Sequence, residues 1–200
     1  MTLVGKAAPA FTAAAVSGDG QIVSSYRFPV DCKNRYAILV FYPLDFTFVC
    51  PSELIALHHR LEAFQKRDCE IIAISIDSQY THYAWRNTPV DQGGIGAVGY
   101  TLIADTHHAI CRAYGVESEP HGVAFRASFL IDRDGIVRHQ VVNDLPLGRD
   151  FDELLRMVDA LQFYERHGEV CPAGWRAGEA GMKDSREGVA AYLKQHAARL

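Results

Sequence analysis

The segment with the strongest chemical signature is centred on one cysteine. Cys50 stands directly before Pro51, and Glu53 follows three residues later. Proline is favoured in the first turn of a helix, and Glu53 has the spacing of a capping box with Cys50 in the cap position. We therefore expect a helix to begin here, with the sulfur facing free N–H groups of its first turn. This arrangement favours nucleophilic attack by a thiolate. The alternative is that Cys50 is a small buried hydrophobic residue, as free cysteines often are.

A helix terminus is not sufficient to turn a thiol into a nucleophile. The thiolate is the reactive form. Raising the ratio of thiolate to thiol a hundredfold requires that the thiolate be stabilised relative to the thiol by about 2.7 kcal/mol. A helix N-terminus supplies about 0.3–1 kcal/mol and at most about 2 kcal/mol. A cation must therefore contribute. Arg126 is well placed if the strand that it begins brings it to the same edge of a sheet as Cys50; otherwise it is an ordinary surface arginine.

The elements that must position these residues alternate between strands and helices. Continuous apolar runs predict buried strands over residues 36–42 and 70–76. Apolar residues three and four apart predict helices over residues 51–67 and 150–166. The other expected elements are a hairpin turning at residues 17–20, a helix over 79–87, a strand over 100–103, a helix near 106–114, a hairpin of strands 127–131 and 136–142, and a short helix over 187–197. This order predicts an α/β fold whose mostly parallel sheet gains an antiparallel edge from the second hairpin.

The composition and the ends of the chain limit the class of protein. The 200 residues are 48% hydrophobic and 22% charged, as in ordinary globular proteins, and the formal net charge of −4 gives no reason to expect nucleic-acid binding. The apolar runs are shorter than the roughly 18 residues that span a bilayer. No secretory signal is visible, so we expect a cytoplasmic protein. Residues 1–166 form the expected main domain, and residues 167–200 form a C-terminal arm rich in glycine and charge.

The remaining cysteines and the histidines give no pattern for a metal or a dithiol. The five cysteines include no C-x-x-C pair, which excludes a thioredoxin-type dithiol and a zinc site of paired cysteines. The histidine pairs 58–59 and 107–108 are adjacent and point to different helix faces, so we expect no metal site. Cys69 and Cys111 are predicted to be buried and inert. Cys32 is expected in a polar loop, where an exposed thiol could oxidise incidentally.

A motif around Cys50 resembles the active site of a known enzyme family. Pro43-x-x-x-Thr47-x-x-Cys50 resembles the motif of the peroxiredoxins, and residues 46–51 resemble its version in the typical two-cysteine branch, which includes the alkyl hydroperoxide reductase C subunits. The resemblance covers nearly the whole chain and includes Trp85, Arg126 within residues 125–129, residues 145–149 and residues 168–175. It implies a thioredoxin-like fold with an N-terminal hairpin extension, a C-terminal arm and a mixed central sheet flanked by helices.

The resemblance implies a role for each matching residue of the pocket. Cys50 would attack one peroxide oxygen and become a sulfenic acid. Arg126 would favour the thiolate and stabilise the charge on the departing oxygen. Thr47 would exchange hydrogen bonds with the peroxide, and Pro43 would limit the access of water.

Three further residues are implied as support for this pocket. Glu53 and Arg149 resemble the residues that hold the arginine and the loop in place. Tyr42 either contributes its hydroxyl group or serves only as a packing residue.

Cys171 matches the resolving cysteine of the family. It would condense with the sulfenic acid of a partner subunit after the first turn of the Cys50 helix unwinds, so the functional unit would be a homodimer, and five dimers often close into a ring decamer. A thioredoxin or a flavoprotein reductase would reduce the resulting disulfide. The implied function is reduction of hydrogen peroxide and organic hydroperoxides, with no cofactor in the chain. The alternatives are a holdase chaperone switched on by overoxidation, and a generic thioredoxin-like oxidoreductase that the missing C-x-x-C disfavours.

Overall fold

The computed structural model describes residues 2–32 and 34–200. The chain divides into two compact units, Met1–Phe151 and Asp152–Leu200. All of the long helix α5 (Phe151–His167) except Phe151 therefore belongs to the C-terminal unit, whereas the sequence predicted it at the end of the main domain. The reason lies in its contacts, because the ring of Phe163 packs on Trp175 at 4.7 Å and Arg156 donates to the Trp175 carbonyl oxygen.

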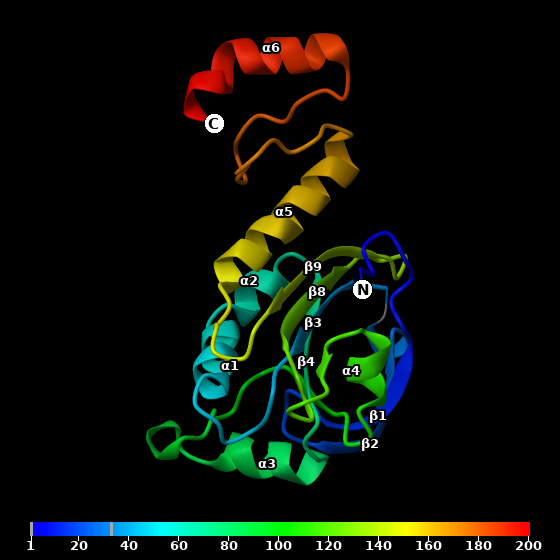
Figure 1. Cartoon of the computed structure of the whole chain (residues 1–200), viewed down its shortest axis with the longest axis vertical. Helices are drawn as coiled ribbons and strands as arrows, with labels where there is room; N and C mark the ends of the chain where they lie inside the picture. The colour runs from blue at the N-terminus through cyan, green and yellow to red at the C-terminus, as the bar shows by residue number, and fades with distance from the viewer. Residues whose placement is uncertain (1, 33) are drawn as a thin grey trace. The chain divides into compact units, whose positions relative to one another are not determined.

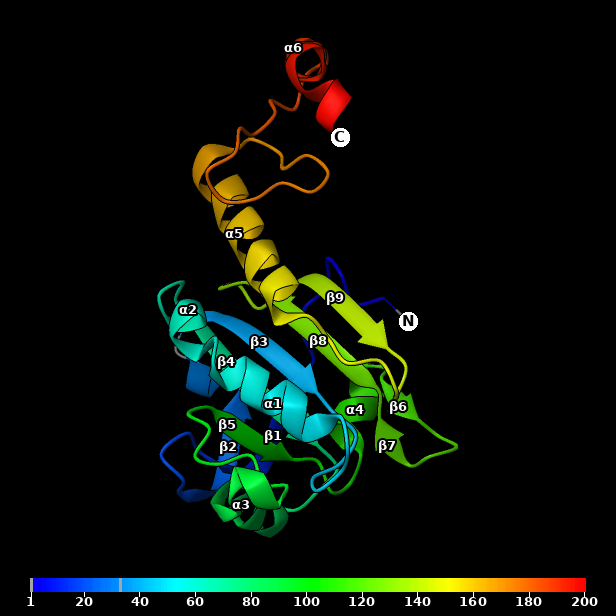
Figure 2. The ribbon, with the colours of Figure 1, turned by 90° about the vertical axis from the view of Figure 1, so that its left-hand side faces the viewer.

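One mixed sheet organises the first unit. Within the described residues it has seven strands in the order β2-β1-β5-β4-β3-β8-β9 (Figure 2). Their bounds are β1 Phe11–Val16, β2 Ile22–Phe28, β3 Tyr36–Phe41, β4 Cys69–Ser75, β5 Thr101–Ala104, β8 Arg126–Ile131 and β9 Val137–Asn143. Among these strands only the pairs β3–β4 and β4–β5 are parallel. The prediction of a mostly parallel sheet is wrong, because β8 enters antiparallel beside β3 and the N-terminal hairpin adds β1 antiparallel to β5. The mixed sheet and the two hairpins are confirmed.

Helices cover both faces of this sheet. Figure 1 shows α1 and α2 on one face and α4 on the other. The helices and turns are α1 Cys50–His58, α2 Leu61–Gln65, α3 Gln79–Asn87, α4 Ala109–Ala113, α6 Arg186–His196, and the 3-10 turns η1 Val30–Cys32, η2 Val90–Gln92 and η3 Ala197–Arg199. A separate small hairpin joins β6 (Glu117–Ser118) to β7 (Val123–Ala124). Side chains alternate along a strand, so Leu39 and Phe41 of β3 lie on the same face. Both belong to the buried cluster that contains Ile110 of α4 and Tyr114, the residue directly after α4.

Two predicted helices are shorter than expected. The stretch over residues 51–67 is two helices, because the backbone of Arg60 leaves the helical region (φ −104°, ψ 0°) between α1 and α2. The helix expected near residues 106–114 begins only at Ala109, since His108 adopts a left-handed conformation with φ 58°. None of the helices formed by residues 2–32 and 34–200 combines the length and the apolar character that a membrane span needs.

Candidate active site

Cys50 and Arg126 are brought together by the antiparallel pairing of β3 with β8. Phe41 at the end of β3 lies opposite Ala127, so Arg126 stands at the sheet edge where the loop to α1 begins. Arg126 Nη1 donates to Cys50 Sγ at 3.4 Å. Cys50 is 0% exposed and Arg126 4% exposed. In such a dry position a guanidinium stabilises negative charge on sulfur far better than it would in water.

The start of α1 differs from the expected capping box. Cys50 is the first residue of the helix, and Val49 before it has helical angles (φ −84°, ψ −35°) and no side-chain cap. The Glu53 N–H donates to the Val49 carbonyl oxygen at 3.2 Å and is therefore not free to face the sulfur. The prediction of a capping box is thus wrong, whereas the prediction that Pro51 lies in the first turn of the helix is confirmed. The Glu53 carboxylate instead accepts charge-assisted hydrogen bonds from buried guanidinium groups and from the Arg149 backbone N–H.

Glu53 joins two arginines beside the sulfur. Its Oε2 accepts from Arg126 Nη1 at 2.8 Å and from Arg149 Nη2 at 2.9 Å, and its Oε1 accepts from Arg149 Nε at 2.8 Å. Arg149 Nη1 also donates to the carbonyl oxygens of Phe41 and Ala127, so it ties together the ends of β3 and β8. The structure therefore brings the predicted residue Glu53 into direct contact with both Arg149 and Arg126.

The buried ion cluster carries an excess of positive charge. The side chains of Glu53, Arg126 and Arg149 are 2%, 5% and 3% exposed, and one carboxylate faces two guanidinium groups. Burial by itself raises the pKa of the Glu53 carboxyl, but the hydrogen bonds and charge of Arg149, with the charge of Arg126, outweigh it and hold that pKa below its ordinary value. An uncompensated buried charge is costly. A thiolate at Cys50 would bring the formal charge of the cluster to zero.

Replacing Glu53 with glutamine is expected to destabilise the protein by about 3–5 kcal/mol at pH 7, because two buried guanidinium groups lose their carboxylate. Since the native pKa of Glu53 is lowered, its contribution is complete above the pH at which the unfolded carboxyl titrates and is lost as the pH falls through the native pKa. In denaturant titrations, the difference in free energy of unfolding between wild type and Glu53→Gln should be constant above about pH 5 and shrink below it.

The matched control for this measurement is Glu62→Gln on α2. Glu62 pairs with Lys66 on the surface, and its side chain is 79% exposed. Its replacement should change the free energy of unfolding by less than about 0.5 kcal/mol. A difference for Glu53→Gln that stays the same at acidic pH would contradict the assignment of a native carboxylate to Glu53.

The loop between β3 and α1 carries the predicted residues Pro43 and Thr47. Pro43 is buried and Thr47 is partly exposed. Thr47 Oγ1 donates to the Leu44 carbonyl oxygen at 2.8 Å. Because a hydroxyl oxygen can accept hydrogen bonds while it donates one, Thr47 Oγ1 remains able to accept a hydrogen bond from a ligand. Phe48 in the same loop is 97% exposed.

The hydroxyl of Tyr42 is engaged in a buried network of its own. It donates to Asp45 Oδ1 at 2.8 Å and lies 3.4 Å from His82 Nδ1. Burial and the charge of Asp45 raise the pKa of Tyr42 well above its ordinary value, so the hydroxyl keeps its proton. The Tyr42 ring lies 6.1 Å from that of Trp85. These contacts agree with the packing interpretation of Tyr42 rather than with a hydroxyl directed at the sulfur.

Asp45 and His82 are residues that the sequence analysis missed. Asp45 Oδ2 lies 2.8 Å from His82 Nδ1, and both side chains are fully buried. The Asp45 N–H donates to Asp77 Oδ2 at 2.9 Å. These bonds anchor the loop that carries Pro43 and Thr47. The available signal was the spacing of His82 and Trp85, three apart on one face of α3, which indicates that both point inward.

Cys171 lies in the second unit, between α5 and α6. It is partly exposed, and its Sγ donates to the Ala160 carbonyl oxygen at 3.4 Å. The neighbouring Val170 forms an antiparallel bridge with Met182, which closes the loop around the thiol. Burial raises the pKa of Cys171, partly offset by the charge of Arg156.

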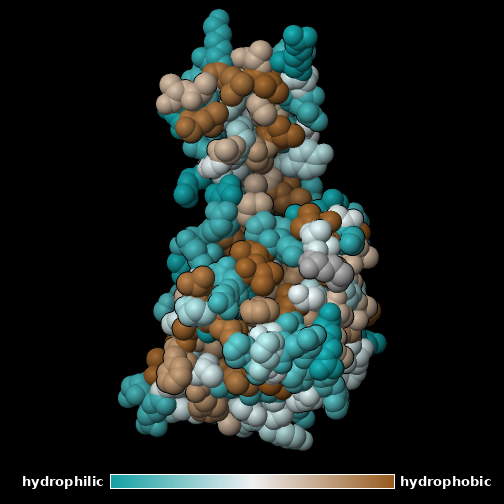
Figure 3. Space-filling view, in the orientation of Figure 1, coloured by the Kyte–Doolittle hydropathy of each residue, from teal (hydrophilic) through white to brown (hydrophobic). Residues whose placement is uncertain are grey.

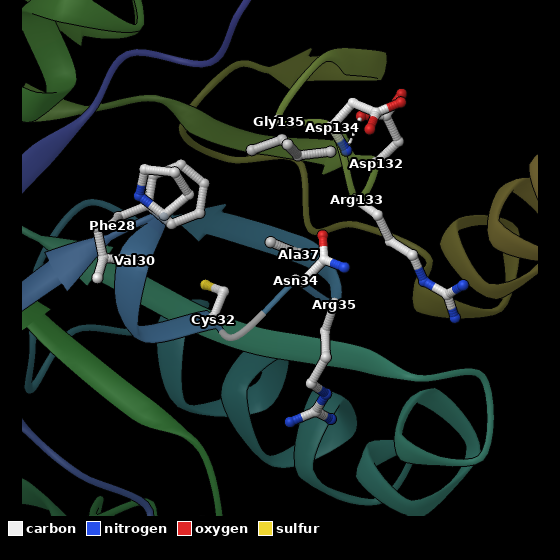
Figure 4. A pocket seen from close by; sticks show the side chains of 12 residues that line it. Phe28, Val30, Cys32, Asn34, Arg35, Ala37, Asp132, Arg133, Asp134 and Gly135 are labelled. Atoms are coloured by element: carbon white, nitrogen blue, oxygen red, sulfur yellow. Dashed lines mark hydrogen bonds between the residues drawn. The ribbon is translucent and has the colours of Figure 1, made fainter.

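The expectation of an exposed thiol at Cys32 is wrong. The turn η1 folds the segment back, and Cys32 is 3% exposed within the core cluster. Burial raises the pKa of the Cys32 thiol to about 11, although a hydrogen bond from Tyr26 opposes the rise. Cys32 borders a pocket of about 240 Å³ between the end of β2 and the β8–β9 turn (Figure 4). Cys69 and Cys111 are buried, as predicted. The raised pKa disfavours the thiolate of Cys32, whereas Cys50 has the Arg126 guanidinium beside its sulfur.

Comparisons with known proteins agree with this geometry. A family model described as the AhpC/TSA family matches residues 4–140, and one described as the C-terminal domain of 1-Cys peroxiredoxin matches residues 160–195. Alkyl hydroperoxide reductase C of Buchnera aphidicola subsp. Baizongia pistaciae is 50% identical over 195 residues, 98% of each chain. The same enzyme of Helicobacter pylori strain 26695 is 50% identical over 198 residues, 99% of this chain and 100% of the relative.

Solved structures show the same fold. The reduced 2-Cys peroxiredoxin of Plasmodium vivax superposes with a TM-score of 0.93 at 48% identity, covering 97% of this chain and 100% of that chain. Enterococcus faecalis AhpC superposes with a TM-score of 0.77 at 35% identity, covering 86% of this chain and 100% of that chain. With the buried cysteine, its arginine and these matches, the chain belongs to the AhpC/TSA family and is a peroxiredoxin, a thiol peroxidase with a thioredoxin-like fold.

Proposed function

We propose that this peroxiredoxin reduces hydrogen peroxide and organic hydroperoxides through Cys50, with Cys171 of a second copy as the resolving thiol. One observation carries the proposal. Arg126 Nη1 lies 3.4 Å from Cys50 Sγ and 2.8 Å from the Glu53 carboxylate, in a buried cluster of two guanidinium groups and one carboxylate. A thiolate at Cys50 completes the charge balance of this cluster, which stabilises the nucleophilic form of the sulfur.

In the first step the Cys50 thiolate attacks one oxygen of the peroxide. The S–O bond forms as the O–O bond breaks, the sulfur is oxidised to a sulfenic acid, and the departing oxygen takes up one proton to leave as water or alcohol. Arg126 stabilises the negative charge that develops on the departing oxygen. Thr47 accepts a hydrogen bond from the peroxide and orients it, and Pro43 closes the pocket with a residue that has no N–H to offer water.

In the second step the Cys171 thiol condenses with the sulfenic acid, giving a disulfide and one molecule of water. Because Cys50 is fully buried, the first turn of α1 must open locally before the two sulfurs meet. A thioredoxin or a flavoprotein disulfide reductase then returns two electrons by thiol–disulfide exchange and restores both thiols.

We further propose a homodimer, in which Cys171 of one copy reaches Cys50 of the other, and a ring of five such dimers. Strand β9 ends the sheet, and it exposes Val141 and Val142. In the second unit Val189, Leu193 and Leu200 are exposed on α6 and beyond, and Figure 3 shows hydrophobic residues gathered near α6. Exposed apolar groups of this kind are typical of interfaces. The proposed location is the cytoplasm, where thiols are kept reduced and the five free cysteines of this structure would persist.

The Cys171→Ser variant tests the resolving step. Wild type treated with one equivalent of hydrogen peroxide should give a disulfide-linked dimer on a non-reducing gel, and Cys171→Ser should give none. Its first oxidation should keep the wild-type rate within about twofold, because Cys171 does not act before the sulfenic acid has formed. Steady-state turnover with thioredoxin as the reductant should stop. Cys69→Ser, which replaces a buried thiol outside the mechanism, should still form the linked dimer. A linked dimer of Cys171→Ser would overturn the pairing.

A further inference from the structure

A cluster of three different ligand types lies beside α4, outside the peroxide site. His108 precedes the helix, Cys111 belongs to it, and Glu117 begins β6. One imidazole nitrogen, the Sγ atom and one carboxylate oxygen all lie within 4.8 Å of one another. Nitrogen, sulfur and oxygen are the ligand atoms of zinc, which in its open sites binds three side chains and one water. We propose that His108, Cys111 and Glu117 form a binding site for a divalent ion of the zinc class.

The three residues differ in burial, so that the cluster is closed on its inner side and open to solvent on its outer side. Cys111 is 1% exposed and marks the inner end of the cluster. The side chains of His108 and Glu117 are 22% and 11% exposed and form its outer side. The left-handed backbone of His108 (φ 58°) places it above the first turn of α4, where it lies close to Cys111. The Cys111 N–H donates to Asp105 Oδ2 at 2.8 Å, which fixes the helix that carries the thiol.

The charges around the cluster favour a cation. Asp105 is 3% exposed, and its carboxylate accepts hydrogen bonds from the first backbone N–H groups of α4. With Glu117 it supplies two negative charges, against one positive charge from Arg112. Binding of a divalent ion by the Cys111 thiolate would add one more negative charge and release one proton. The two anionic ligands, the Cys111 thiolate and the Glu117 carboxylate, then carry a formal charge of −2, which balances the divalent ion.

Arg112 is the competitor for this site. Its Nε donates to Glu117 Oε2 at 2.6 Å and its Nη2 to Oε1 at 3.0 Å, while His108 Nδ1 lies 2.7 Å from the same Oε1. The Arg112 side chain is 60% exposed and that of Glu117 is 11% exposed. The guanidinium can therefore turn into water while the carboxylate stays in place for the ion, but the two hydrogen bonds of this pair must break first.

Zinc titration of the reduced, metal-free full chain tests the proposal, with a chromophoric chelator as competitor. Wild type should bind one ion per chain at this site, and Co²⁺ should give a sulfur-to-metal charge-transfer band. His108→Asn and Cys111→Ser should weaken zinc binding at least about tenfold. Asparagine tolerates the left-handed backbone of position 108, and serine can keep the hydrogen bond from position 111 to the His108 carbonyl oxygen. Melting curves without zinc verify that both variants fold.

Two further variants decide between this site and other thiols. Cys69→Ser, which also removes a buried thiol that donates to a backbone carbonyl, should bind zinc as wild type does. Arg112→Ala removes the competitor and should tighten binding about two- to fivefold. If Cys111→Ser keeps the affinity and stoichiometry of wild type, the ion is held by other thiols such as Cys50 or Cys171 and the proposal is overturned. Absence of zinc binding by wild type overturns it as well.

Discussion

Cys50→Ser is expected to lower the rate of peroxide consumption by at least about 10³-fold, because removal of a catalytic nucleophile commonly lowers a rate by that factor or more. A serine hydroxyl does not ionise near neutral pH, so the charge balance that the buried arginines provide cannot turn it into a nucleophile. Its oxygen also cannot take the place of sulfur in a sulfenic acid. The measurement is the consumption of hydrogen peroxide with thioredoxin and its reductase as the electron source.

The control for this variant is Cys69→Ser. Cys69 is 0% exposed, as Cys50 is, but it lies at the start of β4, and its Sγ donates to the Arg67 carbonyl oxygen. It should keep the wild-type rate within about twofold. Wild-type turnover by Cys50→Ser would refute the assignment of the nucleophile. Protection of a client protein from aggregation without any turnover in wild type would instead favour the holdase chaperone.

Arg126→Lys is expected to slow the first oxidation of Cys50 by about 10²–10³-fold, the usual cost of losing one donor to a developing oxyanion. Arg126 reaches Cys50 and Glu53 through Nη1 and the Leu145 carbonyl oxygen through Nε. A lysine keeps the charge but offers a single ammonium, which cannot reproduce this planar arrangement. Because the positive charge beside Glu53 remains, the variant tests geometry rather than the loss of a buried ion pair.

The measurement for Arg126→Lys is the second-order rate of sulfenic acid formation, from quenched samples analysed by mass. The matched control is Arg133→Lys, since Arg133 is 50% exposed and pairs with Asp68 on the surface. This control should react at the wild-type rate. Equal rates for Arg126→Lys and wild type would show that charge alone is sufficient and that the Arg126 hydrogen bonds do not contribute to the reaction.

Local patterns explain which parts of the fold were predictable. The apolar run that becomes β3 is buried throughout, and Pro51 occupies the first turn of α1 as its preference for that position predicts. Such features depend on neighbours along the chain. The two breaks at Arg60 and His108 were not predictable, because each requires one residue to leave the helical region within an otherwise amphipathic stretch. The direction of the strands in the sheet was also predicted wrongly, because it depends on the long-range pairing of β8 with β3 and of β1 with β5.

From its amino acids alone, the chain could be assigned a nucleophilic cysteine at the start of a helix, an arginine as its cation and an α/β framework to hold them. The family resemblance also pointed to Glu53 and Arg149 as supporting residues, but which atoms pair required the folded molecule. Glu53 lies 73 positions from Arg126 and 96 from Arg149, and it serves these arginines rather than the end of its own helix. Cys32 is likewise buried by contacts that its polar neighbours in the sequence do not reveal. The physical reason is that short-range propensity acts between neighbours, whereas the neutralisation of buried charge depends on which distant strands meet.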